Sequence, residues 1–346
     1  MTNDRSAARL GLAAIGCLAA IALPHAAWGG SDSHTCTAVA SAQLEACRSE
    51  VKASYATAKA SCLNLGDAAA RSACFDEAKT AREEDGDECR EQRSARRDLC
   101  DELGGGRYDP SFDPADFDTD FASPPHPNPY FPLQIGDTWE YAGGGEEIAI
   151  EVLAETKSIE GVTCVVVRDF VEVEGAVVED TDDWFGQRKD GTVDYCGEIS
   201  QSFELFPGDA PLLPELVSLE GSWKTGREGA RPGTLFPGSP TVGQVYRQEF
   251  APGTAEDAAQ VLSTTYGFGS DPELDELVPQ ALADLLCAAD DCVVTKEFSP
   301  LSPDSFERKY YAAGVGLFLE VAPEDAEIVQ LVGCNVDARC GSLPTP

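Results

Sequence analysis

Twelve cysteines that follow residue 30 constrain this chain more than any other feature. Six lie between residues 36 and 100, and six lie between residues 164 and 340. The first six are placed symmetrically about residue 68, as the pairs Cys62 and Cys74, Cys47 and Cys89, and Cys36 and Cys100. Residues at one level of two antiparallel segments have this relation, so the spacing predicts an antiparallel helical hairpin joined by three nested disulfides.

The composition of residues 30–103 supports that hairpin. The segment is rich in Ala, Glu, Arg, Lys and Gln, which favour helices, and residues 35–103 contain no proline. Asn64–Asp67 combines a helix C-cap with an N-cap signal and predicts the turn. Small residues such as Ala40 and Ala53 permit the close helix spacing that disulfides need. The alternative is two or three short helices with local bridges.

Residues 1–29 have the pattern of a secretory signal peptide. Arg5 and Arg9 precede the apolar run Leu10–Leu23, and Ala27-Trp28-Gly29 predicts cleavage before Gly30. A rival interpretation places a lipid anchor on Cys17. No later run reaches the ~18 apolar residues of a membrane span. We therefore expect an exported protein, periplasmic or extracellular, with disulfide bonds and no transmembrane segment in the mature chain.

A proline-rich linker over residues 104–129 connects the hairpin to a second domain. Phe112, Phe117 and Phe121 are expected to hold this linker against that domain. Residues 130–346 contain short β-branched and aromatic runs separated by turns, with one helix around Glu273–Leu286. The ten predicted strands are Glu147–Thr156, Cys164–Val173, Ala176–Phe185, Thr192–Gly197, Gln244–Phe250, Gln260–Thr265, Cys292–Phe298, Glu307–Tyr311, Gly316–Val321 and Glu327–Val332. This pattern predicts an antiparallel β-barrel or β-sandwich, and an α+β protein overall.

The cysteines of the second domain allow fifteen connectivities. Cys164 and Cys292 both fall in predicted strands, and Cys334 and Cys340 can close a small loop. We therefore expect the pairs Cys164–Cys292 and Cys334–Cys340, which leaves Cys196–Cys287.

The charge excludes several classes of function. The chain has 61 acidic and 25 basic residues, three histidines and a net charge of −36. Nucleic-acid binding requires a basic face and is not expected. The scarcity of histidine argues against a catalytic triad or a histidine zinc site, and no nucleotide-binding or nucleophile-elbow motif is present.

Carboxylates are the main side chains left that could bind a metal ion or act in catalysis. Four acids precede Trp184, and Glu198 follows across a hairpin turn; the four are Glu179, Asp180, Asp182 and Asp183. Alternation along a strand places Asp180 and Asp182 on one face and the other two on the opposite face. The cluster suits Ca²⁺, the one cofactor considered, or a glycosidase-like carboxyl pair. The alternative is a solvated edge whose acids pair with Arg168, Arg188, Lys296 and Lys309.

A second candidate site depends on how the strands converge. If the few basic residues of the β domain meet inside it, they form a polar ligand pocket. The expected ligand-binding residues are Arg168, Asp183, Trp184, Arg247, Glu249 and Lys296. No catalytic residue is assigned.

Several motifs together resemble a family of uncharacterised secreted bacterial β-rich proteins. They include Asn128–Leu133, Gly136–Tyr141, Gly161–Asp169 and Glu179–Trp184. The similarity covers roughly residues 109–321 and excludes the cysteine hairpin. Cys196 departs from the pattern, because relatives tend to have an aromatic residue there. The resemblance implies an exported β fold and no established activity.

The expected function is that of an exported, non-enzymatic protein. Its β domain would bind a small ligand, apolar or otherwise, or a component of the cell envelope. The alternatives are a carboxylate-dependent hydrolase and a calcium-stabilised structural or interaction protein.

Overall fold

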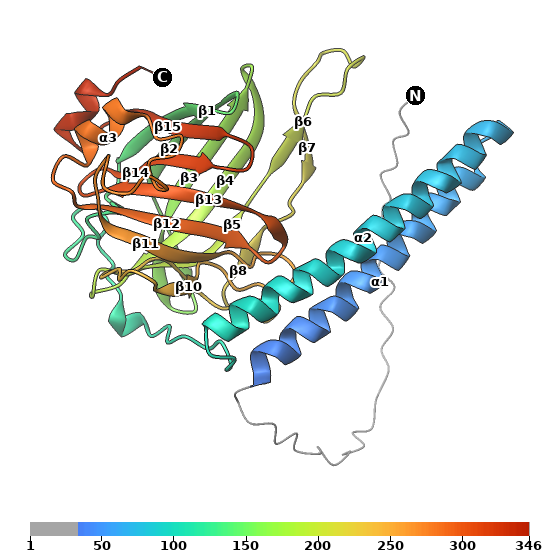
Figure 1. The fold of residues 1–346 in the computed structure, drawn as a ribbon, viewed down its shortest axis with the longest axis horizontal. Helices are drawn as coiled ribbons and strands as arrows, with labels where there is room; N and C mark the ends of the chain where they lie inside the picture. Colours follow the sequence, from blue (N-terminus) through green and yellow to red (C-terminus); the bar gives the residue numbers. More distant parts are fainter. Residues whose placement is uncertain (1–33, 346) are drawn as a thin grey trace.

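Two long helices and one large antiparallel sheet form most of the described part of the chain (Figure 1). The computed structural model describes residues 34–345, so the predicted signal peptide and Cys17 lie outside the described residues. The helices are α1 (Thr35–Leu63) and α2 (Ala68–Glu102). The predicted α+β class, a stapled helical hairpin followed by an antiparallel β domain, is confirmed.

The three nested disulfides of the hairpin are all present. Cys36–Cys100, Cys47–Cys89 and Cys62–Cys74 join α1 and α2 with Cα–Cα distances of 5.7, 5.8 and 5.5 Å. Asp67 caps α2, since its Oδ1 accepts a hydrogen bond of 2.8 Å from the backbone N–H of Ala70. The symmetric spacing therefore corresponds to the true pairing, and the alternative with local bridges is wrong.

The sheet contains fifteen strands, five more than the sequence pattern indicated. The additional strands are β1 and the short strands β6–β9. The bounds are β1 (Thr138–Gly143), β2 (Glu146–Ile159), β3 (Val162–Val173), β4 (Ala176–Gln187), β5 (Val193–Ile199), β6 (Ser202–Glu204), β7 (Glu215–Ser218), β8 (Trp223–Lys224), β9 (Gly233–Phe236), β10 (Val245–Arg247), β11 (Ala258–Tyr266), β12 (Cys292–Ser299), β13 (Ser302–Ala312), β14 (Gly316–Ala322) and β15 (Glu327–Cys334). One short helix, α3 (Gln280–Leu286), begins later than predicted because Pro279 ends the preceding turn.

The strand path is β10-β11-β12-β13-β14-β15-β1-β2-β3-β4-β5-β8, and its two ends are not hydrogen-bonded to each other in the described chain. The sheet curls without closing, so the barrel alternative is wrong. Prolines such as Pro207, Pro211 and Pro214 interrupt the segment between β5 and β10 and remove ladder donors. Instead, β9 crosses close to the chain after β10, where a Cβ on Gly233 would lie 1.7 Å from the carbonyl oxygen of Gln248.

The curled sheet has a buried inner face and a second, smaller core on its outer face. The inner core takes side chains from β1–β5 and β10–β15. The outer core covers β3–β5, where Phe112 and Phe117 of the linker pack on it, while Phe121 joins the inner core. The predicted contact between the linker and the β domain is confirmed.

Two of the three disulfides predicted for the β domain are wrong. The pairs are Cys164–Cys196 and Cys287–Cys292, in place of Cys164–Cys292 and Cys196–Cys287. Strands β3 and β12 are not neighbours, so Cys164 cannot reach Cys292. Cys164 and Cys196 instead flank β4, where Gly186 leaves space; a Cβ there would lie 3.4 Å from the Cys196 sulfur.

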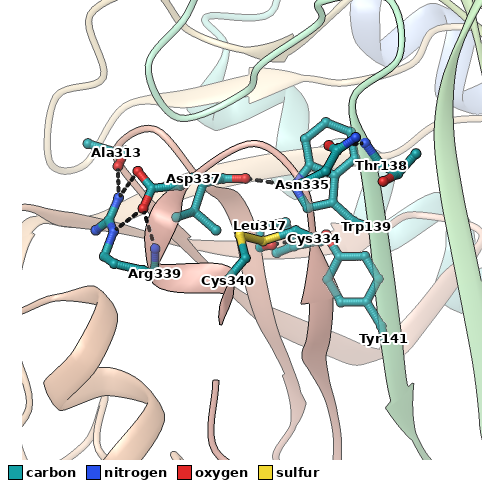
Figure 2. The surroundings of a disulfide bond; sticks show 11 residues. Thr138, Trp139, Tyr141, Ala313, Leu317, Cys334, Asn335, Asp337, Arg339 and Cys340 are labelled. Carbon is teal, nitrogen blue, oxygen red and sulfur yellow. Dashed lines mark hydrogen bonds and ion pairs between the residues drawn. A yellow bond between two sulfur atoms is a disulfide. The ribbon is translucent and has the colours of Figure 1, made fainter. Parts of the chain in front are cut away.

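The third disulfide, Cys334–Cys340, is confirmed and fixes the C-terminal turn to the end of β15, beside the start of β1 (Figure 2). The backbone N–H of Thr138 donates to Oδ1 of Asn335 at 2.9 Å. Arg339 holds the turn through Asp337, with 2.9 Å between Nε and Oδ1. These contacts position β1 beside β15.

The hairpin contacts the β domain through the C-terminal half of α2 and the first turns of α1, and its turn points away from the sheet (Figure 1). Arg96 Nε lies 2.8 Å from Oε2 of Glu256, and both side chains are 5% exposed. Gln92 Nε2 donates to the carbonyl of Leu301 at 3.0 Å. The six disulfides indicate an oxidising, extracytoplasmic environment. None of the described helices combines the length and the apolar character of a membrane span.

The outermost bridge of the hairpin is expected to stabilise the protein. Replacing Cys36 and Cys100 by alanine frees the arms 36–47 and 89–100 in the unfolded chain. The free energy of unfolding should fall by about 3 kcal/mol, measured by guanidinium denaturation. The matched control replaces Cys334 and Cys340, which close a much shorter loop, and should lose less. An equal loss in both variants would contradict the loop-entropy explanation.

Candidate functional site

Two adjoining cavities lie within the curl of the sheet. Their volumes are about 220 Å³ and about 490 Å³. They share seven lining residues, which are Asp169, Asp183, Tyr195, Leu235, Gln248, Glu297 and Lys309. We refer to the first as the aromatic cavity, after Phe131, Trp139, Tyr141, Phe185 and Tyr311. The second is the acidic cavity, after Glu179, Glu198, Glu249 and Asp257.

Strand alternation directs the acids of β4 into these cavities. Glu179 and Asp183 face inward, while Asp180 faces outward and pairs with Arg168. Opposite Asp183 in the ladder stands Glu198 of β5. The register of β4 and β5 shifts beside this pair, which allows both Tyr195 and Glu198 to reach the interior.

A single tyrosine joins the two facing carboxyls. The hydroxyl of Tyr195 contacts Oδ1 of Asp183 and lies 3.1 Å from Oε2 of Glu198. A hydroxyl has one hydrogen to donate, so the second contact is a hydrogen bond only if one carboxyl carries a proton. Burial supplies the reason for such a proton, since it raises the pKa of Asp183 and brings that of Glu198 to about 7.

Other acids of the interior have equally perturbed pKa values. Burial, with the negative charges of Asp183 and Glu179, raises the pKa of Asp169 to about 8. Oδ1 of Asp169 is buried and has no hydrogen-bond partner. Burial also raises the pKa of Glu249, whose Oε1 accepts a hydrogen bond of 3.1 Å from the indole of Trp223. These groups lack the positive partner that buried carboxylates require.

Lys309 is the one cation among the described residues that line the two cavities. Its ammonium lies 3.3 Å from Glu320, 3.4 Å from Glu297 and 3.7 Å from Glu307. Burial lowers the pKa of Lys309, but these carboxylates outweigh the effect and raise it. The positive charge of Lys309 is therefore already balanced by these carboxylates. The cavity-lining acids on β3, β4 and β5 are left without a cation to pair with.

The structure separates the six residues expected to bind a ligand. Only Asp183 and Glu249 line the acidic cavity. Arg168 pairs with Asp180 on the outer face of β4, and Trp184 lies there under Lys157, whose ammonium is 3.4 Å from the ring centre. Lys296 lies over Phe306, and Arg247 lines a different cavity beside the hairpin. The expected convergence of basic residues does not occur.

The four acids considered for calcium are also divided. Glu179 lines the acidic cavity with Asp183, whereas Asp180 and Asp182 lie around Arg168 on the other face. This division follows the predicted alternation, and it keeps the four from meeting at one ion. Within residues 34–345 there is no group of three or more acids, histidines or cysteines arranged to hold a metal.

Several residues of the interior were not assigned to a site by sequence. They include Tyr195, Asp257 and Lys309, together with Asp169, which appeared only as part of a motif. Strand periodicity could have placed Lys309 and Tyr311 on one face. The register shift near Tyr195 has no comparable sequence signal.

No protein-family model, curated protein or solved structure matches this chain. The resemblance to secreted bacterial β-rich proteins therefore stays a prediction.

The raised pKa values predict that alkali weakens the fold. Between pH 5 and pH 8 the folded protein binds more protons at Asp169 and Glu198 than the unfolded chain, whose carboxyls titrate near pH 4. The free energy of unfolding should therefore fall as pH rises, by up to about 1.4 kcal/mol per pH unit for each carboxyl.

The substitution Asp169→Asn should make this slope shallower and stabilise the protein at pH 8, measured by guanidinium unfolding at several pH values. Asp304→Asn, at an exposed position of β13, is the matched control and should leave the slope unchanged. A slope that is the same in wild type and Asp169→Asn would show that Asp169 is not the group responsible.

Proposed function

We propose that this protein is an exported binding protein whose interior takes a small organic cation with an apolar body. One observation carries the proposal: eight acidic residues and a single lysine line the adjoining cavities. The acidic cavity borders an aromatic wall that includes Trp139, Phe185 and Tyr311. Carboxylates beside aromatic rings are the chemistry that recognises an ammonium group attached to an apolar skeleton.

The electrostatics of the empty cavity favour a cation. Burial raises the pKa of Asp183, brings that of Glu198 to about 7 and brings that of Asp169 to about 8, so this group of acids retains protons near neutral pH. An entering ammonium group would supply the missing positive charge and allow one of these acids to ionise. Binding should therefore release a proton, which a neutral ligand would not do.

The size and polarity of the space limit the ligand. The acidic cavity, of about 490 Å³, falls in the size range of small-molecule sites, and the aromatic cavity adds about 220 Å³ beside it. The aromatic cavity is lined by apolar residues such as Leu133, Ile150 and Val152, which suit a ring or a short alkyl chain. Four acids also line this cavity, namely Asp169, Asp183, Glu297 and Glu320, and the first three are shared with the acidic cavity. A monoamine of this shape fits better than a fully apolar ligand, because the acids would stay unpaired beside the latter.

The hydrolase alternative has weaker support. Asp183 and Glu198 face each other, which resembles the carboxyl pair of a glycosidase. However, the Tyr195 hydroxyl contacts both carboxyls and occupies the space that a glycosidic oxygen would need. The calcium alternative is supported less, because its four acids lie on two faces. An envelope partner has no specific contact surface among the expected residues.

The proposed export rests on the disulfides. All twelve cysteines of the described chain are paired, as expected for a protein that matures in an oxidising compartment. The signal-like residues 1–29 and the resemblance to secreted β-rich proteins support the same location.

The test uses 2-phenylethylamine and its neutral analogue 2-phenylethanol as probes in isothermal titration calorimetry. The amine should bind at least tenfold more tightly than the alcohol at pH 7.5. Titrations in two buffers of different ionisation enthalpy should show proton release with the amine alone. Asp183→Asn should weaken amine binding at least tenfold, because it removes an acid that contacts Tyr195 in the acidic cavity.

Asp304→Asn serves as the control, since it removes one negative charge from an exposed position and should bind like the wild type. Equal affinities for amine and alcohol, or no saturable binding of the amine, would contradict the proposal.

A further inference from the structure

A third cavity, of about 200 Å³, lies between the helical hairpin and the β domain and has the opposite charge character. We call it the junction cavity; α1 and α2 line one side, and the chain around β10 lines the other. Arginines from both units line it. They include Arg96 of α2, Arg247 of β10, and Arg231 from the chain before β10. In a chain with 61 acidic and 25 basic residues, such a gathering of arginines is unexpected.

Two of these arginines are buried and incompletely paired. Arg96 is 4% exposed and Arg247 is 5% exposed. Arg96 donates from Nε to Glu256, but its Nη1 is buried without a hydrogen-bond partner. Arg247 Nε is also buried without a partner, and its Nη2 reaches only the sulfur of Cys36, at 3.8 Å. A sulfur of this kind is a weak acceptor, so both guanidinium groups retain unused donors.

Charge compensation of the two buried arginines, Arg96 and Arg247, is incomplete. Glu256 is the one acid among its described lining residues, and it serves Arg96. Arg231 pairs outside with Asp109, at 3.3 Å. Arg247 lies beside the paired rings of Phe250 and Tyr108, 5.0 and 5.7 Å from their centres, which steadies the cation without neutralising it. Burial, with the positive charge of Arg96 in addition, lowers the pKa of Arg247 against the opposing effect of Glu256.

We propose that the junction cavity binds a small oxyanion, a phosphate, sulfate or carboxylate group, between Arg96 and Arg247. The planar forks of guanidinium groups match the oxygen geometry of these anions. A bound oxyanion accepts from the donors that lack partners and supplies the missing negative charge. Because Arg96 belongs to α2 and Arg247 to β10, the anion also links the hairpin to the β domain.

The experiment titrates the full-length mature protein with inorganic phosphate, sulfate or acetate at constant ionic strength, with chloride as the balancing anion. Calorimetry should show saturable binding of at least one of them, and the comparison identifies tetrahedral or carboxylate oxyanions as the preferred class. Arg247→Gln should weaken that binding at least tenfold. Arg168→Gln, which changes an arginine on the outer face of β4, should bind like the wild type.

Two further variants make the result decisive. If Arg247→Gln does not fold, Arg231→Gln replaces it, because that side chain is 47% exposed, and it should bind at least threefold more weakly. Asp183→Asn should bind the oxyanion like the wild type, because Asp183 does not line the junction cavity. The proposal is overturned if none of the three anions binds saturably, or if the arginine variant that folds binds as tightly as the wild type.

Discussion

A carboxyl group that leaves water for a protein interior must find a positive partner or keep its proton, and this constraint governs the interior of the curled sheet. Eight acids and one lysine line its adjoining cavities. Lys309 is compensated by the acids around it, so Asp169, Asp183 and Glu198 are left to burial and to one another. These buried acids therefore retain protons near neutral pH. A cation that enters the interior can convert one of them into a carboxylate.

The disulfides and the linker give this interior its shape. Cys164–Cys196 fixes the outer face of β3–β5, and Phe117 packs over the same region, while Cys334–Cys340 fixes the turn after β15, whose Asn335 accepts a hydrogen bond from Thr138 of β1. The inner face can therefore contain buried polar groups. Burying them lowers the stability of the fold, and the surrounding hydrophobic core offsets that cost. The hairpin adds a second charged cavity of opposite sign, where Arg96 and Arg247 meet. A strongly acidic protein therefore gathers arginines, two of them buried with unused donors, at a place where its two units join.

Much of the fold could be predicted from the sequence, because it depends on local residue patterns and on the spacing of the cysteines. The spacing of Cys36–Cys100 predicted the nested hairpin, and β-branched runs predicted ten of the strands. The strands β6–β9 are short and lie among prolines, so their pattern is too weak to detect. The pairing of Cys164 with Cys196 depends on the order of strands in the sheet, which no local pattern reveals. For the site, alternation placed Asp183 and Glu179 on one face, but the register shift that brings in Tyr195 arises only from packing.

Infrared difference spectroscopy tests the central claim most directly, because protonated and ionised carboxyls absorb at separate positions. The account predicts a protonated-carboxyl band in the empty protein at pH 7, reduced in Asp169→Asn. Addition of 2-phenylethylamine should convert part of that band into carboxylate absorption. An empty protein whose carboxyls are all ionised at pH 7, or a protonated band that the amine leaves unchanged, would contradict it.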